Sequence, residues 1–114
     1  MTDYSSWTDE QVNEAIFKAR GWEYIPYPEI LAWQRPAENE FGCVDMWYAE
    51  VPNYTHDWRL CGELLEEMQP FTILTKNEFG WQCSSRFGST SHKETAGRSI
   101  AEQYLNFVAW KEQG

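Results

Sequence analysis

The chain has 114 residues, 17% of them aromatic, and a formal net charge of −9. This length holds one hydrophobic core, so we expect a single domain over 1–114, ordered from about 7 to 112. The aromatic content excludes a disordered chain, because such chains bury too little apolar surface to offset their entropy. No apolar run is long enough to cross a bilayer, and the first residues lack the pattern of a secretory signal. We therefore expect no membrane association.

The three cysteines, Cys43, Cys61 and Cys83, cannot all pair with one another, and none lies in a CxxC pattern. This usage favours a reducing compartment, the cytoplasm, and buried hydrophobic roles for the thiols. The two histidines, His56 and His92, add no spaced ligand set, so we expect no metal and no cofactor. A nucleophilic pair of Cys43 and His56 stays open as a minor alternative. No phosphate-binding or dinucleotide-binding glycine motif is present, so the chain is interpreted as non-enzymatic.

The charge is unevenly distributed along the chain. Residues 1–70 contain fourteen acidic and four basic side chains (4 − 14 = −10), and residues 71–114 contain four acidic and five basic ones (5 − 4 = +1). Nucleic-acid binding requires a basic surface, so we expect no direct contact with DNA or RNA. An acidic surface keeps a small protein soluble and attracts a basic partner.

The first predicted element is a helix that follows Thr8. Thr8 and Gln11 have the spacing of a capping box, and Val12, Ile16 and Ala19 line one face. Lys18, Arg20 and Gly21 predict where the helix ends.

Strands are expected next. Prolines 26 and 28 restrict residues 22–33 to an edge strand or to a strand that begins after them, at 30–33. Residues 35–42 are predicted to be a turn, and 44–49 to be a second short strand.

A second helix is predicted to follow Thr55 as its cap and to stop before Pro70. We expect Trp58, Cys61, Leu64, Leu65 and Met68 to be buried on one face and three glutamates to face water. The glutamates concerned are Glu63, Glu66 and Glu67.

A hairpin and a third helix complete the pattern. Residues 71–76 and 81–87 are predicted strands around a turn at 77–80, followed by a loop at 88–93. Thr95 is predicted to cap a helix that keeps Ile100, Tyr104, Phe107 and Val108 on one face. The order of elements predicts an α+β fold, an α/β/α-type sandwich of three helices on a small, mostly antiparallel sheet.

Two surfaces are candidates for binding. There are more aromatic side chains in the acidic half than one small core readily hides, which favours an exposed protein-binding face. We assign to that face Trp47, Tyr48, Tyr54, Glu63, Glu66 and Glu67. The sequence leaves open whether this face instead closes a homo-oligomer.

The other candidate is a basic, hydroxyl-rich loop ahead of the third helix. Its Ser/Thr hydroxyls, Arg side chains and the free N–H groups at a helix start suit a phosphate. The residues concerned are Arg86, Ser89, Thr90, His92, Lys93 and Arg98. A polar loop that serves only turns and the helix cap accounts for the same residues.

Several motifs occur in an order that resembles one family of small phage proteins. They are Ala19-Arg20-Gly21-Trp22, Trp33-x-x-Pro36, Val51-Pro52-Asn53-Tyr54-Thr55-His56-Asp57-Trp58 with Leu64-Leu65-Glu66-Glu67-Met68, Gly80-Trp81, and Glu94-Thr95-Ala96 with Ile100-Ala101-Glu102. Together they cover about residues 9–112 and resemble the phage ABA-sandwich domain family. The resemblance implies an α/β/α-type sandwich, a bacteriophage or prophage origin and no known catalytic residues.

The sequence and the resemblance together lead to one functional hypothesis. We expect a small acidic phage accessory protein in the host cytoplasm that binds a host or defence-system protein, for example as an anti-defence inhibitor that mimics nucleic-acid charge. The alternative is a sponge that sequesters a small nucleotide signal in the loop from Arg86 to Arg98.

Overall fold

The structure is a computed structural model, and it describes residues 4–27, 30–38, 44–68, 72–85, 88–91 and 93–113. Residues 25–27, 30–32, 36–38 and 44–49 are described by their backbone. The elements are, in chain order, the 3-10 helix η1 (Tyr4–Ser6), α1 (Asp9–Ala19), β1 (Glu23–Tyr27), β2 (Ile30–Glu38), β3 (Val44–Ala49), α2 (Trp58–Met68), β4 (Ile73–Asn77), β5 (Gly80–Ser85), β6 (Gly88–Ser89) and α3 (Ala96–Glu112).

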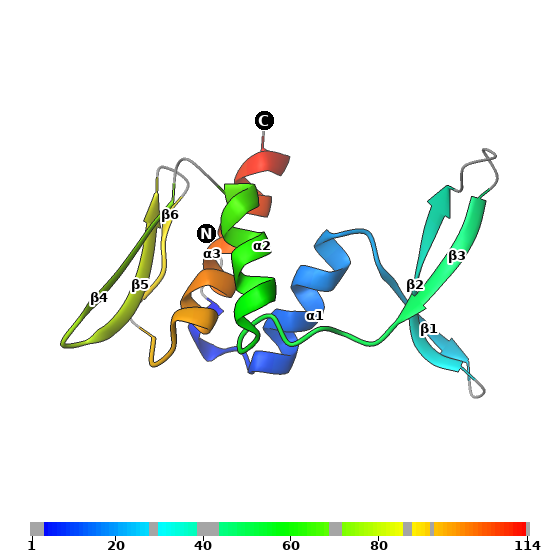
Figure 1. Cartoon of the computed structure of the whole chain (residues 1–114), viewed down its shortest axis with the longest axis horizontal. Helices are drawn as coiled ribbons and strands as arrows, with labels where there is room; N and C mark the ends of the chain where they lie inside the picture. Colours follow the sequence, from blue (N-terminus) through cyan, green and yellow to red (C-terminus); the bar gives the residue numbers. More distant parts are fainter. Residues whose placement is uncertain are drawn as a thin grey trace.

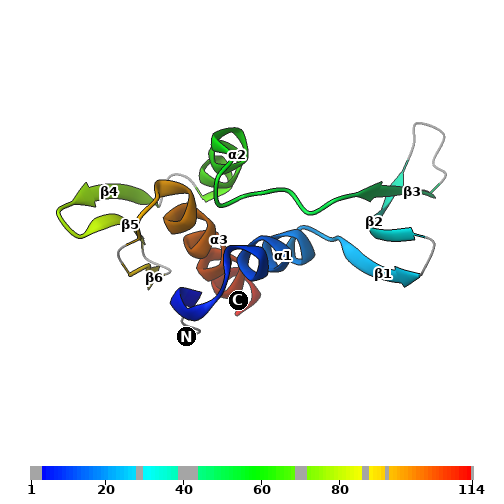
Figure 2. The same cartoon turned by 90° about the horizontal axis from the view of Figure 1, so that it is seen from below.

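Three helices occupy the middle of an elongated molecule that measures 49 × 30 × 26 Å. Sheet A (β1, β2 and β3) lies at one end and sheet B (β4, β5 and β6) at the other, as Figures 1 and 2 show. The predicted α+β class is confirmed, but the strands form two antiparallel sheets instead of one.

The start and end of α1 follow the local signals in the sequence. The Thr8 hydroxyl accepts a hydrogen bond from the Gln11 amide at 3.1 Å, and the Gln11 side chain accepts one from the Thr8 amide at 2.9 Å, which confirms the capping box. After the helix the chain turns at Gly21, whose φ of 98° lies in the left-handed region that glycine tolerates best.

Sheet A is an antiparallel meander. β1 is an edge strand that contains Pro26, as predicted, and β2 is the central strand. The expected turn at 35–42 is wrong for its first part, because β2 continues to Glu38 and its residues 33–38 pair with β3. Local turn propensity is overridden here by pairing with β3.

Sheet B is the predicted hairpin with a small addition. β4 and β5 pair around the turn at Asn77–Gly80. Gly88 and Ser89, expected in a loop, form β6 against the end of β5. Thr95 caps α3 by accepting a hydrogen bond from the Arg98 amide at 3.2 Å, which confirms its predicted role.

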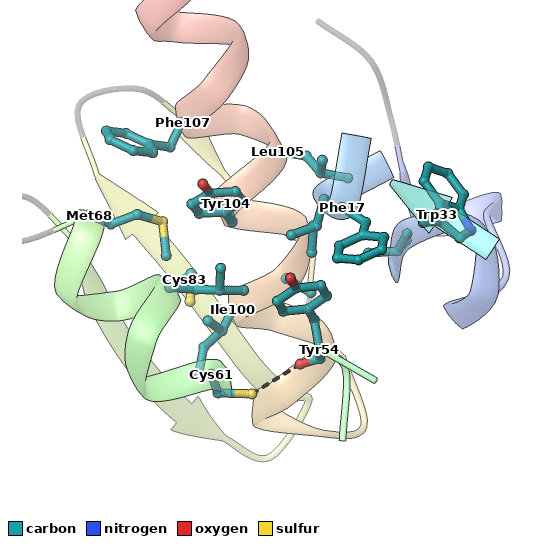
Figure 3. Close-up of a cluster of buried hydrophobic side chains, with 14 residues drawn as sticks. Phe17, Trp33, Tyr54, Cys61, Met68, Cys83, Ile100, Tyr104, Leu105 and Phe107 are labelled. Atoms are coloured by element: carbon teal, nitrogen blue, oxygen red, sulfur yellow. Dashed lines mark hydrogen bonds between the residues drawn. The ribbon is translucent and has the colours of Figure 1, made fainter. Parts of the chain in front are cut away.

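The core lies among the three helices, β5 and the base of sheet A (Figure 3). Its fully buried side chains include Ile16, Leu64, Met68, Cys83 and Ile100. Among the described side chains of sheet A, Trp33 belongs to this core, and its ring lies 5.4 Å from that of Phe17. Sheet A is therefore attached to the helices mainly at its base.

A close approach between backbones positions the start of α3. A Cβ atom at Gly97 would collide with the backbone carbonyl of Thr55. The segment before α2 and the first turn of α3 thus pack in direct contact, which is open only to glycine. Among the described residues, no helix has the length and apolar character required to span a membrane.

Candidate functional site

The exposed half of α2 is the most distinct surface of the helices. Cys61, Leu64 and Met68 are buried against the core, whereas the positions on the opposite side of the helix are exposed. These exposed positions are Trp58, Arg59, Gly62, Glu63, Glu66 and Glu67. They form a continuous strip along the helix, which we call the α2 outer face.

Trp58 dominates this face, with 66% of its surface exposed. Its prediction as part of the buried stripe is wrong. It is the first residue of α2, and side chains of a helix lean toward its N-terminus, so the ring extends past the packed part of the helix. The predicted cap is also wrong, since Asp57 instead of Thr55 accepts the hydrogen bond from the Arg59 amide, at 2.9 Å.

The three glutamates differ in their partners. Glu67 pairs with Arg20, the C-cap residue of α1, at 2.8 Å and helps to hold the two helices together. Within the part of the chain that the structure describes, Glu63 and Glu66 form no salt bridge. Their charges are therefore available to a partner, as predicted for solvent-facing glutamates.

Between Trp58 and Glu66, Gly62 leaves a notch in the strip. No heavy atom outside its own helix backbone lies within 4 Å of the position that a Cβ atom would occupy. Glycine in an exposed helix costs about 1 kcal/mol relative to alanine. Nothing in the packing of this fold requires glycine there.

Tyr54, predicted at the surface, belongs to the interior, and so does Tyr104, which was predicted on the apolar face of the third helix. Tyr54 was assigned to the binding face, but it is 3% exposed and its carbonyl accepts a hydrogen bond from the Cys61 thiol at 3.1 Å (Figure 3). Burial raises the pKa of Tyr54, and it raises that of Tyr104 together with a hydrogen bond to Glu67. Tyr54 thus packs inward and is removed from the binding face.

For Trp47 and Tyr48 the structure describes the backbone, which lies in β3. They are therefore separated from α2 along the long axis of the molecule, at the end occupied by sheet A (Figure 1). The predicted binding face is in consequence two regions: the α2 outer face and β3.

The basic loop is engaged by the fold itself. Glu102 is 3% exposed and lies between Lys93 at 3.1 Å and Arg98 at 2.7 Å. Arg98 also donates to Asp9 at 2.7 Å and to the carbonyls of Tyr4 and Trp7. Burial by itself lowers the pKa of Arg98, but hydrogen bonds to Glu102 and Asp9 and the attraction of their charges outweigh burial and raise that pKa. The side chain therefore stays charged.

These contacts correct three predicted ligand residues. Lys93 and Arg98 neutralise an internal carboxylate, and Thr90 is buried with its hydroxyl 3.1 Å from that of Ser99. Ser89 is exposed in β6, and Arg86 and His92 lie outside the described residues. Of the cations predicted to bind phosphate, the two that the structure describes, Lys93 and Arg98, are therefore paired within the fold.

A shallow depression of about 360 Å³ lies beside this network, and His56 lines it. The His56 imidazole is 2.9 Å from the Asp9 carboxylate, whose other oxygen binds Arg98. Although burial raises the pKa of Asp9, hydrogen bonds from His56 and Arg98 outweigh it and hold that pKa below the ordinary value. Sequence reasoning missed this link because Asp9 and Arg98 are far apart in the chain; only the four-residue spacing of Arg98 and Glu102 was visible.

The two thiols that the structure describes, those of Cys61 and Cys83, are buried. Burial raises the pKa of Cys61 and of Cys83, so both are protonated at neutral pH. Cys43, the partner in the alternative Cys–His pair, lies outside the described residues. Among the residues that are described, no three His, Cys, Asp or Glu side chains gather in an arrangement that could hold a metal ion.

Comparison of the chain with protein-family models, curated proteins and solved structures finds no match. The resemblance to the phage ABA-sandwich domain family thus stays a prediction from the sequence motifs.

Proposed function

We propose that this protein acts without catalysis, by binding a basic surface of a partner protein through the α2 outer face. The observation that carries the proposal is Trp58, a large aromatic side chain left 66% exposed on the same strip as Glu63 and Glu66. Tryptophan is enriched at the energetic centres of protein interfaces, where a partner desolvates its ring.

The chemistry of the strip indicates the kind of partner. Glu63 and Glu66 lie three residues apart, hence on neighbouring sites of one helix surface. The net charge of −9 gives the whole molecule a field that attracts basic surfaces and accelerates association. The notch at Gly62 lets a side chain of the partner reach the helix backbone between Trp58 and Glu66.

The phage context remains part of this proposal. If the motif resemblance holds, the partner is a host or defence-system protein in the cytoplasm, and one that normally binds nucleic acid would present the basic surface required. The protein would then be an accessory inhibitor that mimics nucleic-acid charge.

Affinity capture from bacterial lysate, followed by titration of the purified partner, tests the proposal. The test variant is Trp58→Ala with Glu63→Lys and Glu66→Lys. The control, Glu14→Lys with Glu78→Lys, reverses two other exposed acids. We expect the test variant to lose at least about 30-fold in affinity, since central interface residues cost about 2 kcal/mol or more when truncated, and the control to lose much less.

Two further readouts separate the parts of the proposal. Duplex DNA should displace the protein from its partner if the charge of nucleic acid is being mimicked, and high salt should slow association. A partner that binds the test variant and the control equally well would refute the α2 outer face as the binding site.

A further inference from the structure

Sheet A has two edges of different character. β1 forms one edge and contains Pro26, which has no N–H to donate, so further strand pairing is blocked there. β3 forms the other edge with the sequence Val-Asp-Met-Trp-Tyr-Ala, which contains no proline, no glycine and one charged residue. Edge strands that natural proteins protect carry proline, lysine or a bulge, and β3 carries none of these.

The position of sheet A leaves the β3 edge accessible. The extensive contacts of β1, β2 and β3 are with one another, whereas strands of sheet B also contact α3. Sheet A lies at one end of the long axis, away from α2 and α3 (Figures 1 and 2). A strand that approaches β3 from outside would meet no helix among the described residues.

We propose that β3 pairs with β3 of a second copy of this chain, in antiparallel orientation about a two-fold axis, and so joins two sheets A into one six-stranded sheet. This inference is independent of the proposed function of α2. The assembly is closed, because its two outer edges are then the β1 strands with Pro26.

The register of this pairing is restricted by backbone geometry. Alternate residues of a strand direct their N–H and C=O groups to the same side, so two copies of one edge pair only when a residue lies opposite its own copy. Centring the axis on Met46 or on Trp47 gives the largest overlap of the six residues. Asp45 then lies opposite Trp47 in the first register and opposite Ala49 in the second.

The charge of the edge favours a second copy as its occupant. Like charges directly opposite one another destabilise a strand pair, and a chain of net charge −9 would be expected to repel itself. In both registers the one acid of β3 meets an uncharged residue. Self-pairing of this edge therefore meets no direct charge opposition.

Sedimentation velocity over a range of concentrations measures the result. We expect the mass to rise with concentration from the 13.5 kDa of one chain toward twice that value. A wild-type chain that stays at 13.5 kDa up to concentrations of about 100 μM would overturn the proposal.

The variant Trp47→Asp distinguishes this edge from any other contact. It places the new carboxylate opposite its own copy in one register and opposite Asp45 in the other, so the variant should be monomeric in both. In the register centred on Trp47, Trp47→Lys mixed with Trp47→Asp should restore a dimer that contains one chain of each kind. In the register centred on Met46, Trp47→Lys should dimerise by itself, because each lysine then lies opposite Asp45 of the other copy. Tyr24→Asp, the same kind of change on β1, serves as the matched control and should still dimerise.

Each outcome decides the matter. A dimer of Trp47→Asp as stable as that of the wild type refutes pairing through β3. Loss of the dimer in the Tyr24→Asp control as well as in Trp47→Asp, with both variants folded by circular dichroism, would also refute it.

Discussion

The two sheets have the same number of strands but differ in how they are covered. Sheet B is packed on α3: Cys83 of β5 is fully buried, and the Gln103 side chain of α3 donates to the Ser85 hydroxyl at 2.9 Å and to the Gly88 carbonyl at 2.8 Å. Sheet A is held at its base by Trp33 against Phe17 and by the stack of Phe17 on Trp22. Among the described residues no helix covers sheet A, which leaves surface available for partners, whereas β5 and β6 of sheet B pack on α3 and β4 is largely exposed.

The largest expected effect comes from the ion network that holds the N-terminus to α3. Arg98→Met leaves the buried Glu102 with Lys93 alone and frees the carbonyls of Tyr4 and Trp7. Removing one partner of a buried pair costs about 3–5 kcal/mol, and we expect the lower part of this range because Lys93 remains. Urea unfolding measures the loss; a change below about 1 kcal/mol would show that the network does not support the fold.

Truncation at the base of sheet A has the next effect. Trp33→Ala should destabilise the protein by about 3 kcal/mol, because the side chain is buried against Phe17. Trp58→Ala removes the same side chain from an exposed site and should change stability by less than about 0.5 kcal/mol. Thermal unfolding of the two variants compares their stabilities directly. An equal loss of stability in both would contradict the claim that the Trp58 side chain does not contribute to folding.

A smaller effect of opposite sign is expected at the notch of α2. Gly62→Ala should stabilise the protein by about 0.5–1 kcal/mol, because alanine favours the helix and no neighbour obstructs its Cβ. Gly97→Ala is the contrasting variant and should be strongly destabilising, since its Cβ would collide with the Thr55 carbonyl. If Gly62→Ala weakens partner binding while it raises the melting temperature, the notch is part of the interface.

The smallest effect concerns acid unfolding. The pKa of Asp9 is held below its ordinary value of 3.8 by hydrogen bonds from His56 and Arg98, which outweigh the effect of burial. A carboxyl with a lowered pKa in the folded state stabilises the protein above its unfolded pKa and loses that contribution as the pH falls through the folded pKa. Asp9→Asn should therefore flatten the loss of stability below about pH 4.

Local signals predicted the elements of the fold well. The capping box of Thr8, the cap of Thr95 and the hairpin around Asn77–Gly80 each depend on residues close together in the chain. The division into two sheets was not predicted, because which strands pair depends on contacts between distant segments. For a related reason Trp58 was predicted to be buried but is exposed, and Tyr54 was predicted to be exposed but is buried. Their burial depends on where α2 begins relative to α3.

The candidate site was predicted in part. The helical spacing of Glu63 and Glu66 already indicated exposed positions, and both are exposed. The roles of Lys93 and Arg98 could not be found from their neighbours, because residues near a helix start can serve a ligand or the fold. The buried Glu102 decides between these roles, and its burial follows from how α3 packs against the N-terminal segment.

The central claim is that α1, α2, α3 and sheet B form the stable part of the protein and that sheet A and the α2 outer face are available for partners. Native-state hydrogen exchange on dilute protein tests it most directly. We predict that amides in the middle of α3 exchange only on global unfolding, whereas those of β1 and β2 exchange through a partial opening of lower free energy. The same opening free energy for α3 and sheet A would contradict the account.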